Sequence, residues 1–126
     1  MVDREITDGR RIATLLQAEL EGLETPPFDT IAVTNEDLDA DTEPPDNRAF
    51  DVERAGEHLA SVNLQADRIV IDFSEGLPAA TERAGQADLR TRPKATTPPG
   101  LLVFVENGAS VKRAVDVIAA AATGAA

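Results

Sequence analysis

The stretch from Arg68 to Ser74 reads RIVIDFS, and its side chains alternate between two phases. Ile69, Ile71 and Phe73 form one phase, and the other phase contains Arg68, Val70, Asp72 and Ser74. A period of two residues with one apolar phase is typical of an antiparallel strand that is buried on one face and exposed on the other. The stretch therefore predicts a half-buried antiparallel strand.

Further strand signals lie on both sides of this stretch. His58 to Leu64 precedes it across the turn at residues 65–67 and predicts the other strand of a hairpin. Leu101 to Val105, LLVFV, is apolar in both phases, which is typical of a central strand. Shorter candidates are Phe28 to Thr34, Ala49 to Glu53, and Leu89 to Pro93. The last would be an edge strand, because Pro93 cannot donate a ladder hydrogen bond.

Three segments have helical patterns. The first is Ile6 to Leu23, where Thr7 or Asp8 can cap the start and leucines recur at helical spacing. The second begins at Pro78 and extends to about Gln86. The third opens at Ala109 or Ser110, and we expect its tail, residues 123–126, to fray. Together these elements predict one α+β domain over residues 1–122, with about three helices on a mixed, largely antiparallel sheet of about five strands.

Length and composition restrict the class of protein. A chain of 126 residues is one domain by length. Cysteine is absent, which excludes disulfides, thiolate metal sites and thiol nucleophiles. The start, MVDREITDGRR, lacks the apolar region of a signal peptide, and no apolar run approaches the roughly 18 residues of a membrane span. We therefore expect a soluble, cytoplasmic protein.

Acidity is the strongest global signal. The chain has 23 Asp and Glu against 12 Lys and Arg, a formal net charge of -11, and only two of the cations are lysines. In molar salt the Debye length is about 3 Å, so crowded carboxylates repel one another weakly. An acidic surface with few lysine stems, which would add apolar area, suits that solvent. The composition predicts a halophilic protein.

The composition also supports a resemblance, together with the run RPKATTPPGLLVFVENGASVKRAVDVI from Arg92 to Ile118. In both respects the chain resembles small haloarchaeal proteins of an uncharacterised family. The resemblance covers most of the chain and supports the salt argument and an archaeal cytoplasm. Its motifs are not functional signatures, so it implies no activity and no site residue.

Candidate catalytic and metal-binding patterns are incomplete. Asp37, Asp39 and Asp41 imitate the start of a calcium loop, but Thr42 and Arg48 occupy the positions that require Gly and Glu. His58 is the only imidazole, and its odd spacing from Ser61 predicts that the two side chains point to opposite faces of a strand. Asp72 falls on the polar phase of its strand. We therefore predict no catalytic residue, no metal and no cofactor, although the question of enzymatic activity stays open.

Positive charge is concentrated in one quarter of the chain. Residues 83–113 contain six cations and two acids, a formal charge of +4 within a chain of -11. Asn107 to Ser110 joins a predicted strand to a helix, whose free N–H groups could hold an anion. The candidate anion- or partner-binding residues are Arg90, Arg92, Lys94, Ser110, Lys112 and Arg113.

Three hypotheses explain this basic region. Nucleic-acid binding is disfavoured, because each phosphate contact loses affinity steeply as salt rises. A binding module or small enzyme for an anionic metabolite or nucleotide is the alternative, since Arg grips carboxylates and phosphates at short range. The favoured hypothesis is a non-catalytic interaction or structural module that forms a homodimer, with the least acidic face at the interface. Leu89 to Lys94 would contact the partner there, either as an edge strand paired with its symmetry mate or through acids of the partner. No membrane partner is expected.

Overall fold

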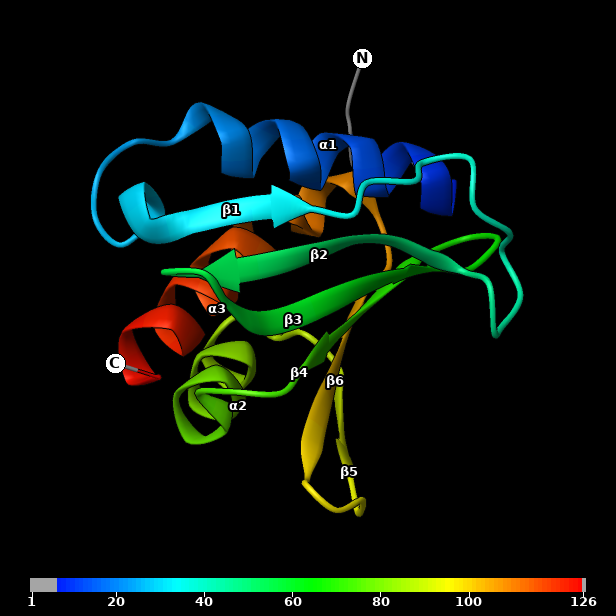
Figure 1. The fold of residues 1–126 in the computed structure, drawn as a ribbon. Coiled ribbons are helices and arrows are strands. Elements are labelled where there is room, and N and C mark those ends of the chain that lie inside the picture. The colour runs from blue at the N-terminus through cyan, green and yellow to red at the C-terminus, as the bar shows by residue number, and fades with distance from the viewer. Residues whose placement is uncertain (1–6, 126) are drawn as a thin grey trace.

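A computed structural model of the protein describes residues 7–125. Its six strands form one sheet, with the order β1-β2-β3-β4-β6-β5 and every neighbouring pair antiparallel (Figure 1). The strands are β1 (Ile31–Thr34), β2 (Arg48–Arg54), β3 (Glu57–Leu64), β4 (Ile69–Phe73), β5 (Thr91–Lys94) and β6 (Gly100–Val105). The predicted α+β class is confirmed, and the sheet has six strands, all antiparallel.

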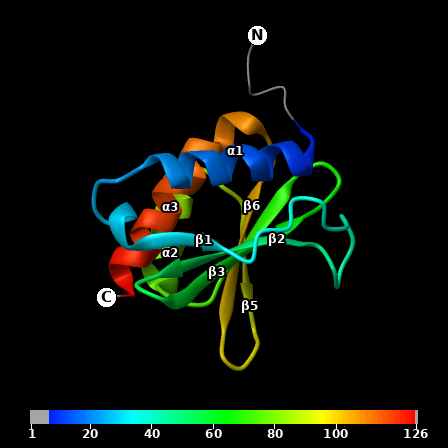
Figure 2. The ribbon, with the colours of Figure 1, turned by 45° about the horizontal axis from the view of Figure 1, so that its top comes forward.

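Three helices accompany the sheet in the described residues: α1 (Gly9–Gly22), α2 (Leu77–Gln86) and α3 (Val111–Gly124). Short 3-10 helices, η2 (Phe28–Thr30) and η3 (Gly108–Ser110), precede β1 and α3. Figure 2 shows α1 and α3 crossing the sheet on the same side, with α2 beside α3. Within residues 7–125, the other side of the sheet therefore has no helix over it.

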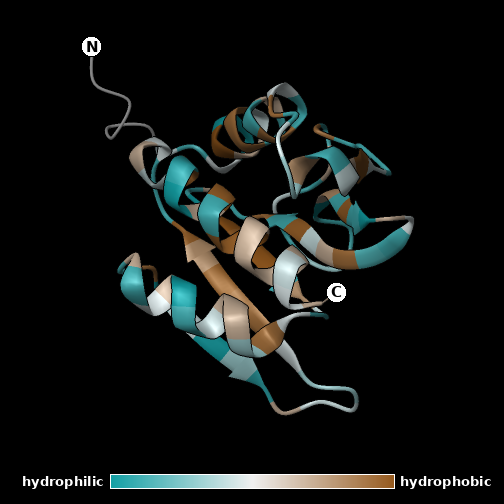
Figure 3. Ribbon diagram, turned by 90° about the vertical axis from the view of Figure 1, so that its left-hand side faces the viewer, coloured by the Kyte–Doolittle hydropathy of each residue, from teal (hydrophilic) through white to brown (hydrophobic). Residues whose placement is uncertain are grey.

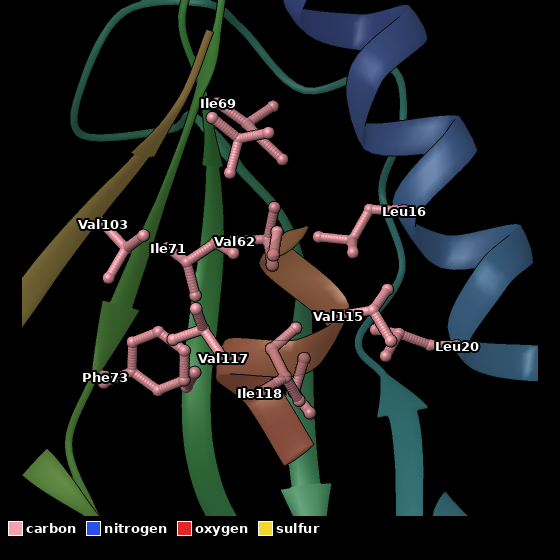
Figure 4. Packing of buried hydrophobic residues seen from close by; sticks show 14 of the residues in the cluster. Leu16, Leu20, Val62, Ile69, Ile71, Phe73, Val103, Val115, Val117 and Ile118 are labelled. Atoms are coloured by element: carbon pink, nitrogen blue, oxygen red, sulfur yellow. The ribbon is translucent and has the colours of Figure 1, made fainter. Parts of the chain in front are cut away.

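The core lies between the sheet and the helices. Val62, Ile71 and Val103 are aligned across three neighbouring strands, so their side chains point to the same face and belong to one buried cluster (Figure 4). On α1, Leu16 and Leu20 lie one turn apart and point into the same core from the helix layer (Figure 4). Figure 3 shows the polar residues of the helices on their outer surfaces. The face of the sheet that meets these helices is the helix face.

Small residues bring α2 and α3 close together. Ala80 and Ala84 of α2 are fully buried, as are Ala114 and Ala121 of α3. Gly76, which caps α2, has a left-handed backbone with φ of 65°, and a Cβ there would meet the backbone carbonyl of Ala121. The fold requires glycine at this position for both reasons.

Several predicted boundaries change in the structure. Asp8 caps α1, since its side chain accepts a hydrogen bond from the Arg11 N–H, whereas the predicted start at Ile6 lies outside the described residues. The strand predicted from Phe28 begins at Ile31, because Phe28–Thr30 forms a 3-10 turn. Helix α3, predicted to open at Ala109 or Ser110, begins at Val111 and ends at Gly124.

None of the helices in residues 7–125 is long and apolar enough to span a lipid bilayer.

Candidate functional site: the open face of the sheet

The face of the sheet that no described helix covers is called here the open face. Its side chains follow from the strand register, since residues paired across antiparallel strands point to the same side. One row across five strands contains Asp51, Ser61, Asp72, Leu102 and Arg92. The row is polar at both ends and apolar only at Leu102. The open face is thus a polar surface supported from behind by the core.

The basic stretch at residues 90–94 forms the rim of this face. Phe104 N–H donates to the Arg90 carbonyl, and β5 continues the pairing with Arg92 opposite Leu102 and Lys94 opposite Gly100. Because side chains alternate along a strand, Arg90, Arg92 and Lys94 all point to the open face. The prediction of an edge strand here is confirmed. These three cations form what we call the basic rim.

Arg90 belongs to a cluster around Phe104. Its guanidinium donates to Glu106 at 2.9 Å, and Arg68 pairs with the same carboxylate at 3.2 Å. The Cζ atoms of Arg68 and Arg90 lie 4.5 and 5.7 Å from the centre of the Phe104 ring. Two arginines thus cover an aromatic ring that would otherwise face solvent. The Arg90 side chain remains 70% exposed.

Lys94 is held by Asp72. Its Nζ donates to Asp72 Oδ2 at 2.7 Å, and the two side chains are 34% and 25% exposed. The stem of Lys94 passes close to Gly100, where a Cβ would lie 3.4 Å from its Cε. Asp72, predicted as a polar-phase surface residue, therefore acts as an acceptor for the basic rim. Arg92, in contrast, is exposed and has no salt bridge within residues 7–125.

Asp51 is a buried carboxylate on the same face. It is 4% exposed and accepts hydrogen bonds from Asn35 Nδ2 and Ser61 Oγ, both at 2.8 Å. Arg48 adds an ion pair at 3.4 Å. Burying a carboxylate is costly unless donors surround it, and here they come from β2, β3 and the connection after β1. Asp51 therefore joins three segments of the open face, a role that its position in the sequence did not reveal.

His58 and Ser61 share this face, so the prediction that they point apart is wrong. Val52 pairs with Ala60 but Glu53 pairs with His58, which leaves Leu59 as an extra residue in β3. Such a bulge shifts the alternation by one residue, and it places Ser61 Oγ 3.4 Å from His58 Nε2. The Ser61 hydroxyl donates its hydrogen bond to Asp51, however, so the serine lies between the carboxylate and the imidazole. A hydrolase triad has the imidazole in the middle.

Two adjoining hollows follow the polar row. One, of about 480 Å³, is lined by the connection after β1, including Asp37 and Asp46. The other, of about 200 Å³, is lined by His58, Lys94 and the hairpin residues after it. Ser61 and Asp72 line both hollows. Ser61 and Asp72 therefore lie in the middle of the open face. The acidic residues Asp37 and Asp46 lie at one end of the two hollows, and Lys94 of the basic rim lies at the other.

The remaining predicted site residues lie elsewhere. Ser110 is 5% exposed on η3, where its Oγ donates to Asn107 Oδ1 and accepts from Arg113. Arg113 also donates to the Ala87 carbonyl, and Lys112 is exposed at the start of α3. The Ser110 N–H already bonds to Asn107. The six predicted residues therefore do not form one site: the basic rim is on the open face, and the other three belong to the helix layer.

The connection at residues 35–47 is called here the acidic loop. It holds six acids and no cation: Glu36, Asp37, Asp39, Asp41, Glu43 and Asp46. Arg10 fixes the loop by donating to the Leu38 and Ala40 carbonyls, and Asp37 N–H donates to the Ala49 carbonyl. No group of three metal-ligating side chains occurs within residues 7–125. The loop is a shaped acidic surface.

Comparison with known proteins places the chain in a family. A family model described as a family of unknown function, DUF7993, matches residues 1–126. The chain belongs to this family. No curated protein and no solved structure matches the chain significantly. The DUF7993 assignment agrees with the predicted resemblance to an uncharacterised family.

Proposed function

We propose that this protein is a non-catalytic interaction module of a halophilic cytoplasm, which forms a homodimer through the open face of its sheet. The observation that carries the proposal is the basic rim on that face. In residues 7–125 the helices lie on one side of the six-stranded sheet and leave the other side available to a partner (Figure 2). That side carries the basic rim, the least acidic edge of an acidic molecule. Two strongly acidic surfaces resist being dehydrated against each other, so we expect an interface between two copies to include the least acidic edge.

The arrangement of Asp51, Ser61 and His58 supports a non-catalytic role. The Ser61 hydroxyl donates a hydrogen bond to Asp51, and Asp51 also has partners in Asn35 and Arg48. The serine is therefore held as a structural donor and is not activated by the imidazole.

The partners of the basic region argue against a site for an anionic metabolite. Arg90 pairs with Glu106, Lys94 with Asp72, and Arg113 with the Ala87 carbonyl and Ser110. A bidentate grip on a small anion requires free donors that converge. The cations of this region are divided between two layers of the fold, and most already have acceptors. An extended partner surface uses such a rim better than a small anion does.

Pairing of two β5 edges is not the arrangement that we propose for this dimer. Arg90 directs its carbonyl toward β6, so Thr91 and Pro93 direct their backbone groups outward. Pro93 has no N–H, which leaves Thr91 as the one outward donor of the strand. A strand added at this edge would lose the ladder bond that an N–H at residue 93 would donate. Contact through side chains of the open face is the arrangement that the backbone favours.

Sedimentation in molar potassium chloride tests the proposal. We expect a dimer for the wild type and a monomer for Arg90→Glu/Arg92→Glu, because reversed charge in a desolvated contact costs about 2–5 kcal/mol of association. Lys112→Glu makes the same kind of change on the helix side and should leave the dimer intact. A monomeric wild type would contradict the homodimer, and a double variant as dimeric as the wild type would contradict its formation through the basic rim.

A further inference from the structure

We infer that the basic rim of one copy binds the acidic loop of the other, so that each dimer contains this contact twice. The inference rests on the proposed homodimer and names the segment that meets the rim. Both segments border the open face, and they lie at separate corners of the molecule (Figures 1 and 2). Their charges are complementary: three cations without an acid at residues 90–94, and six acids without a cation at residues 35–47.

The two hollows indicate how the copies are related. One hollow joins Asp37 and Asp46 of the acidic loop to Ser61 and Asp72, and the other joins Ser61 and Asp72 to Lys94. Ser61 and Asp72 thus lie between the loop and the rim. A two-fold axis through this middle point exchanges the two ends, which brings each loop over the partner's rim. A contact between unlike segments then closes into a symmetric dimer.

Within the described residues of one chain, the acidic loop and the basic rim form no salt bridge with each other. In residues 7–125 no salt bridge joins an acid of the loop to a cation, and Arg92 has no salt bridge. Lys94 and Arg90 are held in place by Asp72 and Glu106, while Arg10 and the Ala49 carbonyl hold the loop. The groups are therefore ordered before association, which lowers the entropy lost on binding.

In molar salt, a contact between the rim and the loop depends on short-range ion pairs. At a Debye length of about 3 Å, diffuse attraction between the two segments is screened, and only charges at hydrogen-bond distance still interact. Arginine and carboxylate form short, paired hydrogen bonds of that kind. Arg92 is therefore the residue on which we expect the contact to depend most.

A charge exchange between copies tests the inference. Two variants are made: Arg92→Glu in one, and Asp37→Lys/Asp46→Lys in the other. Each alone should weaken its homodimer about tenfold or more, because like charges then face each other twice. An equimolar mixture should form a heterodimer as tightly as the wild type. In that heterodimer the glutamate introduced into one copy meets the introduced lysines, while the native Arg92 of the other copy meets the native loop.

The readout is the dimer dissociation constant in molar potassium chloride, measured by sedimentation, with melting curves to establish that each variant is folded. Lys112→Glu mixed with the loop variant is the matched control: Lys112→Glu should still form its own homodimer, and it should form no heterodimer with the loop variant as tight as the wild-type dimer. A dimeric wild type whose Arg92→Glu variant binds equally well, or a mixture that stays monomeric, would overturn the loop contact and leave the homodimer standing. A monomeric wild type would overturn both.

Discussion

Asp51 shows how a single residue can hold the open face together. Its carboxylate is buried, accepts hydrogen bonds from Asn35 and Ser61, and forms an ion pair with Arg48. In Asp51→Asn an N–H group replaces one oxygen and faces a donor, so we expect a loss of about 1–3 kcal/mol in the free energy of unfolding. Chemical denaturation measures the loss. Asp46→Asn, at an exposed position, is the control, and equal stability of the two variants would contradict this role.

Alanine substitutions at two glycines of the α2 region are predicted to change the stability in opposite directions. Gly76→Ala adds a Cβ at a positive φ and against the Ala121 carbonyl, so the variant should lose more than about 2 kcal/mol of stability. Gly85 lies inside α2, and a Cβ there would meet open space, so Gly85→Ala should gain up to about 1 kcal/mol of stability. Thermal melts of both variants check the pair. A neutral Gly76→Ala would show that α2 and α3 do not pack so closely.

Among the elements, the acidic loop carries a prediction about calcium. Its alternating aspartates resemble a calcium loop only at the start, and Arg48, at the position of the bidentate Glu, pairs with Asp51 instead. Asp39→Ser should change the free energy of unfolding by less than about 0.5 kcal/mol. Calorimetric titration with calcium should show no saturable binding. A micromolar isotherm that disappears in Asp39→Ser would prove the loop to be a calcium site.

The whole molecule is predicted to need salt. Its net charge of -11 is spread over a chain of 126 residues, and the basic rim offsets it at one edge only. Lowering potassium chloride to about 0.1 M lengthens the Debye length to about 10 Å and restores repulsion among carboxylates. We expect a marked fall in the melting temperature between molar salt and this lower concentration. An unchanged melting temperature would contradict the halophilic interpretation.

Periodicity in the sequence was sufficient for the elements and for the basic rim. The alternation in residues 68–74, the helical spacing of the leucines in α1, and Pro93 at an edge are local patterns, because side-chain direction repeats every two or 3.6 residues. The alternation by itself also predicts that Arg90 and Arg92 share one face. These features depend on neighbours in the chain, which the sequence displays directly.

The tertiary structure decided which distant residues meet. The bulge at Leu59 arises from the pairing of β2 with β3, and it alone brings His58 to Ser61. The pairing of Asp51 with Asn35 and of Lys94 with Asp72 joins residues 16 and 22 positions apart. Ser110 was separated from the rim because η3 turns it into the helix layer. Long-range pairing is set by the packing of the whole chain, and no local pattern records it.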